Sequence, residues 1–143
     1  MILSQVLKSK GDLVFTAEPG DTIAAVAALL HSRRVGAMIV VDDAHSVIGI
    51  VSERYIVRIV AEEGGAGLSK PISACMTRDV VFADPGETVD VLLERMTDRR
   101  VRHLPVCKDH KLVGIISIGD LVKTKIAETV AEAEGLRAYI SAA

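Results

Sequence analysis

Gly114-Ile115-Ile116-Ser117-Ile118-Gly119-Asp120 is the stretch of this 143-residue chain that decides its fold. Its apolar residues end at a serine, and the pattern then changes at once to one typical of a helix. A similar stretch occurs upstream as Gly49-Ile50-Val51-Ser52-Glu53-Arg54-Tyr55. The second copy carries Asp120 where the first carries Tyr55. The chain therefore predicts two copies of a strand–turn–helix element that differ at one hydrogen-bond acceptor.

The repetition extends well beyond this element. Pro19-Gly20-Asp21-Thr22 aligns with Pro85-Gly86-Glu87-Thr88, 66 residues later. Arg33-Arg34-Val35 aligns with Arg99-Arg100-Val101 at the same offset, and the offset falls to 65 between the two strand–turn–helix stretches. One additional turn residue in the first copy explains this slip. So many matches with a single gap indicate an internal duplication.

Each copy predicts the same order of elements. Thr22 or Thr88 follows a Pro-Gly turn and caps a helix, because its hydroxyl can accept a free N–H of the first turn. The predicted strands lie at 13–16, 37–41 and 47–51 in the first copy, and at 80–83, 104–107 and 111–116 in the second. A second helix begins near Glu53 or Ile118. The predicted fold class is therefore α+β, with two βαββα-type repeats packed about an approximate two-fold axis and a C-terminal helix.

The expected domain boundaries follow the repeats, at 1–64 and 65–125, with a helical extension at 126–143. Residues 62–71 are rich in glycine and predict a flexible linker between the copies. The extension continues in a helical pattern to about Ala138, with an apolar stripe of Ile118, Val122, Ile126, Val130 and Ala133. Because this helix runs past the repeated unit, it needs a surface to lie against, either its own domain or a second subunit.

The composition excludes several classes of protein. A net charge of −2 and a pI near 6.1 give no basic excess for binding nucleic acid, and two Phe, two Tyr and no Trp argue against base stacking. The longest apolar run, 35–41, is too short to cross a membrane. The first eight residues do not resemble a signal peptide. Cys75 and Cys107 are best explained as free thiols, which predicts a cytoplasmic protein.

Ser117 and Asp120 support two interpretations. A serine followed three residues later by an acidic side chain is typical of a capping box, which is purely structural. Alternatively, a carboxylate can accept both hydroxyls of a ribose, and the adjacent helix N-terminus offers N–H groups to a phosphate. Gly119 leaves room for such a ligand. This second interpretation predicts a nucleotide site.

The segment before the preceding strand adds basic groups. Arg99 and Arg100 are explained equally well as a solvated helix end, whereas Arg102 and His103 begin the strand and are better candidates for a phosphate. No partner with metal-ligand spacing accompanies His103, so no metal site is expected. No histidine follows Ser117 to complete a hydrolase triad, and we expect no enzyme activity.

Taken together, these motifs resemble a pair of CBS domains, the family named after cystathionine β-synthase, over about residues 1–125. The resemblance rests on the Gly-h-h-Ser-x-x-Asp stretch (h, apolar), the His103-Leu104-Pro105-Val106 strand and the preceding Met76-Thr77. With the long tail, the chain looks like a small bacterial stand-alone CBS-pair protein. The resemblance implies a disc with two clefts, commonly dimerised. It also implies binding of AMP, ADP, ATP, NAD(H) or, less favoured, S-adenosylmethionine, with no required cofactor.

The resemblance further implies roles for individual residues. Asp120 would hold the ribose and Ser117 the ribose or phosphate, and the walls of this cleft would be Thr77, Val80, Arg102, His103, Leu104 and Pro105. The first cleft would use Ser52 and Arg54, with Gly36, Ala37 and Met38 as a wall. Tyr55 replaces its ribose carboxylate, so this cleft is either empty, specific for a ligand without a diol, or uses Tyr55 for stacking.

The sequence therefore supports two functions. The first is a non-enzymatic regulatory module that binds an adenine nucleotide and transmits energy or redox state to an unknown partner protein, as a homodimer. The second is a structural dimerisation or scaffold module with no physiological ligand, in which Asp120 only caps a helix.

Overall fold

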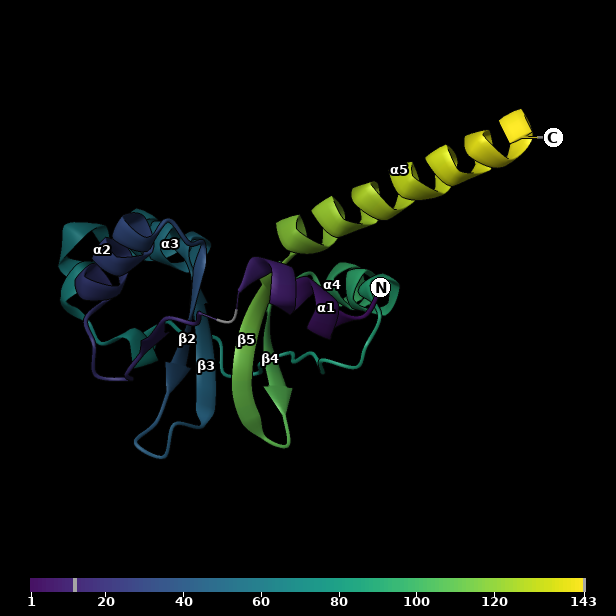
Figure 1. Cartoon of the computed structure of the whole chain (residues 1–143). Coiled ribbons are helices and arrows are strands. Elements are labelled where there is room, and N and C mark those ends of the chain that lie inside the picture. The colour runs from purple at the N-terminus through teal and green to yellow at the C-terminus, as the bar shows by residue number, and fades with distance from the viewer. Residues whose placement is uncertain (12, 143) are drawn as a thin grey trace.

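The computed structural model describes residues 1–11 and 13–142, which form two similar units lying side by side (Figure 1). The first unit contains β1 (Thr16–Ala17), α2 (Ile23–Arg33), β2 (Ala37–Val41), β3 (Val47–Ser52) and α3 (Glu53–Glu63). The second contains α4 (Val89–Arg99), β4 (His103–Lys108), β5 (Lys111–Ser117) and the start of α5 (Ile118–Ala142). The remaining elements are α1 (Leu3–Lys10) and two 3-10 turns, η1 (Gly64–Ser69) and η2 (Ile72–Ala74). The predicted α+β class is confirmed.

The two hairpins repeat each other almost residue for residue. β2 and β3 are antiparallel with Val40 opposite Gly49, and β4 and β5 are antiparallel with Val106 opposite Gly114. In both copies the register shifts directly after this pair. The backbone N–H of Glu53 donates to Gly36 O at 3.0 Å, and that of Ile118 donates to Arg102 O at 2.8 Å in the same way. The duplication therefore produces the predicted pseudo-symmetry.

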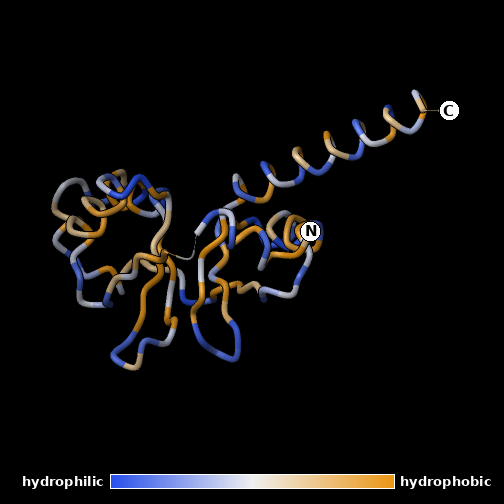
Figure 2. Tube along the Cα trace, viewed as in Figure 1, coloured by the Kyte–Doolittle hydropathy of each residue, from blue (hydrophilic) through white to orange (hydrophobic). Residues whose placement is uncertain are grey.

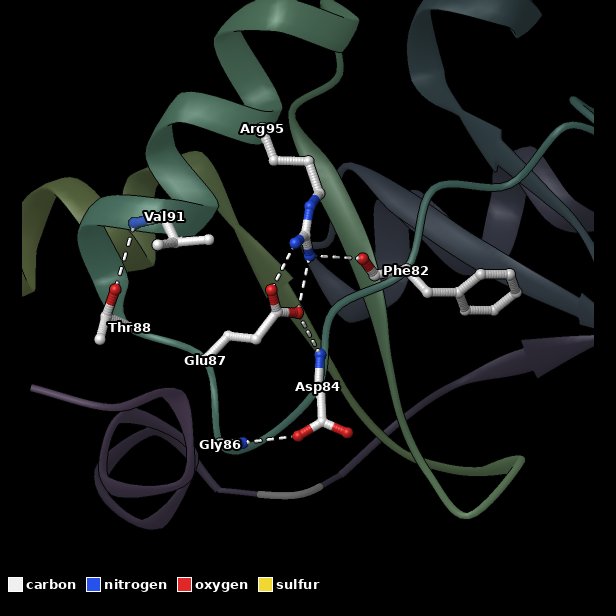
Figure 3. A network of polar contacts seen from close by, with 7 residues as sticks. All are labelled: Phe82, Asp84, Gly86, Glu87, Thr88, Val91 and Arg95. Carbon is white, nitrogen blue, oxygen red and sulfur yellow. Dashed lines mark hydrogen bonds and ion pairs between the residues drawn. The ribbon is translucent and has the colours of Figure 1, made fainter.

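The helix caps are also repeated as predicted. Thr22 Oγ1 accepts from the N–H of Ala25 at 3.1 Å, and Thr88 Oγ1 accepts from the N–H of Val91 at 3.3 Å. In the second unit the turn before the helix is reinforced by Glu87. Its carboxylate accepts from Arg95 on α4 and from the backbone N–H of Asp84, and Arg95 also donates to Phe82 O at 2.9 Å (Figure 3). This network ties the segment before α4 to the helix itself.

The first strand of each repeat is shorter than predicted. β1 covers Thr16–Ala17 and lies parallel to β2, whereas the 80–83 segment forms only a single parallel bridge, between Ala83 and Val106. Extending that bridge by two residues would require an N–H at position 105. Pro105 has none, while the equivalent residue of the first copy, Ile39, pairs with Thr16. One proline thus explains why the prediction of a strand at 80–83 is wrong.

The segment at 62–71 is ordered, so the predicted flexible linker is wrong. α3 continues to Glu63, and η1 then packs against it. Gly67 is buried, and a Cβ at this position would lie 2.7 Å from Ile59 Cγ2 and 2.9 Å from Glu63 Oε2. The glycines therefore permit a close approach between η1 and α3 and do not act as a hinge.

Each hydrophobic core is completed by residues from outside its own repeat. The first core takes Ile72 and Met76, which follow the expected boundary at 64/65. The second core takes Leu3, Val6 and Leu7 of α1, a helix that the sequence did not predict. The N–H of Leu3 also donates to Glu87 O at 2.9 Å. The expected boundary remains a division of the repeats in the sequence, but the cores exchange segments across it.

α5 is 25 residues long and extends away from both units (Figure 1). It ends at Ala142, four residues beyond the predicted end. Leu121, near the start of α5, is fully buried. Along the part of α5 that projects from the units, hydrophobic and hydrophilic residues alternate (Figure 2). Within the described residues, no helix combines the length and hydropathy that spanning a membrane requires.

Candidate functional site

The start of α5 is held by the capping geometry that the sequence predicted. Ser117 is the last residue of β5, and its backbone N–H and Oγ both donate to Asp120 Oδ2, each at 2.9 Å. The backbone N–H of Asp120 donates in return to Ser117 Oγ at 3.2 Å. The structural interpretation of the motif is thus confirmed. It does not by itself exclude a ligand, because a carboxylate has about four acceptor positions.

Lys10, the last residue of α1, is a member of this site that the sequence analysis missed. Its ammonium lies 2.7 Å from Asp120 Oδ2 and donates to Ile115 O at 2.7 Å. The two charged side chains are 30% and 27% exposed, so the pair is reachable from solvent but partly shielded. A cation therefore already lies against the carboxylate proposed to hold a ribose.

The electrostatics keep Asp120 ionised. Partial burial acts to raise the pKa of this carboxyl, but hydrogen bonds from Lys10 and Ser117 outweigh burial and lower the pKa below its usual value of 3.8. At neutral pH the group is a carboxylate, which can only accept hydrogen bonds. It is suited to a ligand that presents donors, such as a vicinal diol.

His103 is the first residue of β4 and pairs with Ser117, the last residue of β5, in the antiparallel register. Burial and the charge of Lys10 lower the pKa of His103 below its usual 6.5, while Asp120 and Glu53 oppose this shift. The imidazole also approaches the first unit, because a Cβ at Gly36 would lie 3.4 Å from both Cε1 and Nε2. Glu53, at the start of α3, is a second nearby group that the sequence analysis missed. The site therefore combines groups from both units and from α1.

The other predicted wall residues are placed in different ways. Arg102 is exposed and accepts the N–H of Ile118 with its carbonyl. Leu104 and Pro105 are buried, with Leu104 in the second core, so only their backbone could face a ligand. Thr77 exchanges two backbone hydrogen bonds with Ile50 of β3, at 2.9 and 3.0 Å.

Val80 lines a shallow depression over α4, together with Val81, Phe82, Val91, Glu94, Arg95, Asp98 and Arg99. Thr77 therefore lies along the sheet of the first unit, and Val80 lies beside α4. Their part in the Asp120 cleft stays a prediction.

The equivalent position in the first unit is built differently. Ser52 is the residue before α3, and its side chain makes no capping hydrogen bond. Tyr55 packs partly against the first core, and the guanidinium of Arg58 lies 5.4 Å from its ring centre. Arg54 is exposed, and Ala37 and Met38 are buried in β2.

A hollow of about 620 Å³ opens nearby, lined by Leu30, His31, Ser32, Arg34, Val35, Gly36 and Glu53. Gly36 and Glu53 thus border both this hollow and His103.

A family model for the CBS domain matches residues 11–62 and 72–126. The chain belongs to the CBS-domain family. Both copies match, so this is a CBS-domain pair, and Lys10 lies just outside the matched residues. No group of three or more His, Cys, Asp or Glu that could bind a metal occurs in the described part of this CBS pair.

Known CBS proteins resemble the chain over most of its length. The CBS domain-containing protein CBSX3, mitochondrial, of Arabidopsis thaliana is 32% identical over 146 residues, which cover 96% of this chain and 71% of CBSX3. The crystal structure of a CBS-domain-containing protein from Agrobacterium tumefaciens has 41% identity and a TM-score of 0.84, covering 87% of this chain and 92% of its own.

The CBS domain pair of protein MJ0100, solved with 5′-methylthioadenosine and S-adenosylmethionine, has a TM-score of 0.80 at 23% identity. The matched region covers 90% of this chain and 98% of the MJ0100 chain. At that identity it supports the fold alone. The comparisons therefore establish the family and the fold of this CBS pair.

Proposed function

We propose that this CBS pair is a non-enzymatic regulatory module of the cytoplasm that binds an adenine nucleotide at Asp120 and reports energy or redox state to a partner protein. The observation that carries the proposal is the placement of the Asp120 carboxylate at a helix start, with Lys10 and His103 beside it. A carboxylate for the ribose hydroxyls, a helix N-terminus and a cation for a phosphate are the groups that a nucleotide requires.

Lys10 favours a phosphorylated ligand. A ribose diol on Asp120 would take over the acceptor position that now receives the ammonium, which lies 2.7 Å from Oδ2. The displaced ammonium would remain within reach of a phosphate on the same ribose, where the charge attraction is favourable. AMP, ADP, ATP and NAD(H) offer such a phosphate. S-adenosylmethionine does not offer a phosphate. It is included in the test because the structure of protein MJ0100 contains it.

Transmission requires that the ligand bind one arrangement of the protein more tightly than another. The Asp120 site contains Lys10 of α1 and lies beside Glu53 of the first unit, so occupancy affects contacts between separate parts of the chain. The first cleft, where Tyr55 replaces the carboxylate, is proposed not to hold a ribose in the same way.

A thermal-shift screen against AMP, ADP, ATP, NAD⁺, NADH and S-adenosylmethionine tests the proposal. A ligand present at one hundred times its dissociation constant should stabilise the protein by about 2.7 kcal/mol. A clear shift with at least one phosphorylated nucleotide is expected. No shift with any of the six would contradict the proposal.

The alternative function is a scaffold in which Asp120 only caps α5, and the capping hydrogen bonds give it a specific basis. Replacing Asp120→Ala separates the two. A lost cap costs about 1 kcal/mol of stability, as Thr88→Ala also should on α4. If Asp120→Ala lowers stability like Thr88→Ala but leaves nucleotide affinity unchanged, Asp120 is only a cap and the proposed nucleotide site is wrong.

A further inference from the structure

α5 carries an apolar stripe along one side of the helix; Val130, which the sequence placed in it, and Tyr139 are also exposed but lie off this side. Ile118, Val122, Ile126, Leu136 and Ile140 follow one another at helical spacing, with Thr129 and Ala133 between them. The five large side chains are 37%, 42%, 59%, 61% and 64% exposed. Apolar residues exposed along the whole length of a helix indicate a surface that another helix covers.

A different face of α5 contacts the chain's own body. Leu121 is buried, Glu128 pairs with the N-terminal ammonium at 3.0 Å, and Lys125 pairs with Asp90 of α4 at 2.9 Å. At 3.6 residues per turn, Leu121 and Glu128 lie about a third of a turn from the centre of the stripe, and Lys125 lies at its border. The stripe therefore stays available for a partner while α5 remains packed on α4.

The charges beside the stripe indicate what that partner is. On one border, Lys123 lies in the first half of the helix and Glu134 in the second half. On the other border, Lys125 lies in the first half and Glu132 in the second. When two identical helices pair in antiparallel orientation, each border meets the same border of the partner. Lys123 then faces Glu134 of the second copy, and Lys125, which also pairs with Asp90 of its own chain, faces Glu132 of the second copy.

The apolar residues select the same alignment. With Thr129 opposite Thr129, Ile118 lies opposite Ile140 and Val122 opposite Leu136, whereas Ile126 lies opposite Glu132. The charge pairs fit this alignment to within one residue. A parallel pair would instead place Lys123 and Lys125 beside their own copies and Glu132 and Glu134 beside theirs, which is unfavourable.

We propose that α5 pairs in antiparallel orientation with α5 of a second copy of this chain, centred on Thr129. The occupant of the stripe is thus a second copy and not a different protein. This surface is independent of the Asp120 site, and it fixes the orientation of the dimer as well as its existence.

Charge reversal tests the pairing. Lys123→Glu alone and Glu134→Lys alone should each weaken the dimer by about tenfold or more, because each places like charges opposite each other twice per dimer. The double variant should regain most of the wild-type affinity, since both contacts are then reversed together. Sedimentation equilibrium gives the dissociation constants. A wild-type protein that remains monomeric, or a double variant no better than the single variants, would overturn the proposal.

Cysteine cross-linking tests the orientation in a background where Cys75 and Cys107 are replaced by alanine. Thr129→Cys should form a disulfide-linked dimer, because the two copies of this residue meet at the centre. Val122→Cys should not, because a rise of about 1.5 Å per residue separates its two copies by roughly 21 Å. Cross-linking at position 122, or none at position 129, would overturn the antiparallel pair.

Discussion

Asp120 Oδ2 accepts hydrogen bonds from the backbone N–H and the hydroxyl of Ser117 and from the ammonium of Lys10. The contacts with Ser117 belong to the helix cap and can persist when a ligand binds. The contact with Lys10 joins two side chains that are each about 30% exposed, and a ribose hydroxyl can replace it. Lys10 is therefore the group whose position we expect to change on binding.

Replacing Lys10→Gln should separate phosphate binding from ribose binding. The affinity for AMP should fall by about tenfold, as expected for the loss of a charge-assisted contact, whereas the affinity for adenosine should stay equal or rise because Asp120 loses a competitor. Isothermal titration calorimetry with both ligands measures this. Equal losses for AMP and adenosine would show that Lys10 only supports the fold of the site.

Gly119→Ala should act in opposite directions on stability and binding. A Cβ at position 119 would lie 3.6 Å from Ser117 Oγ, an ordinary contact, so the protein can accept alanine there. Alanine in a helix is favoured over glycine by about 0.5–1 kcal/mol, and the melting temperature should rise. Nucleotide affinity should fall, because the methyl group occupies ligand space. A stabilised variant with unchanged affinity would place the ligand elsewhere.

His103 should make the protein less stable as the pH falls through about 6.5. Burial and Lys10 lower its pKa in the folded state, so the unfolded chain binds the proton more tightly, and stability present above the unfolded pKa is lost below it. His103→Gln should therefore show a smaller loss of melting temperature between pH 7 and pH 5. The same change at His31, exposed on α2, is the control. Identical profiles for all three proteins would contradict this assignment.

Among the elements, the entry to α4 depends on Glu87. The hydrogen bond from Arg95 lowers the pKa of Glu87 despite partial burial, so the ionised form stabilises the folded state above the usual pKa of 4.5. Glu87→Gln should lower the free energy of unfolding by about 1–2 kcal/mol at neutral pH. Between pH 7 and pH 4 this variant should lose less stability than the wild type loses. Urea unfolding at pH 7 and pH 4 measures both. Glu94→Gln, an exposed change on the same helix, should have little effect.

The hairpins and most helices could be predicted because their signals are local. Thr22 and Thr88 mark helix starts, and β-rich apolar runs separated by polar turns mark the paired strands. α1 could not be predicted, because an eight-residue helix without a side-chain cap depends on packing for its stability. Its partners lie in the second core, far along the sequence. The missing strand at 80–83 depends on Pro105 in a neighbouring strand, which is equally non-local.

At the scale of the whole molecule, the site combines groups that are far apart in the sequence. Asp120, Ser117 and His103 were predicted from motifs within one repeat. Lys10 was missed because its contact with Asp120 spans 110 positions, and Glu53 because its position near His103 follows from how the two units lie together. Repeat motifs therefore predict the half of a site that lies within one unit, and only the packed structure supplies the other half.

The central claim is tested most directly by isothermal titration calorimetry of AMP, or of the best nucleotide from the thermal-shift screen, with wild type and Asp120→Asn. Asparagine keeps an oxygen for the cap but loses the charge, so affinity should fall about tenfold or more while the fold is retained. Wild type should bind one nucleotide per chain, since Tyr55 occupies the equivalent position of the first unit. Unchanged affinity in Asp120→Asn, or two equivalent sites per chain, would contradict the account.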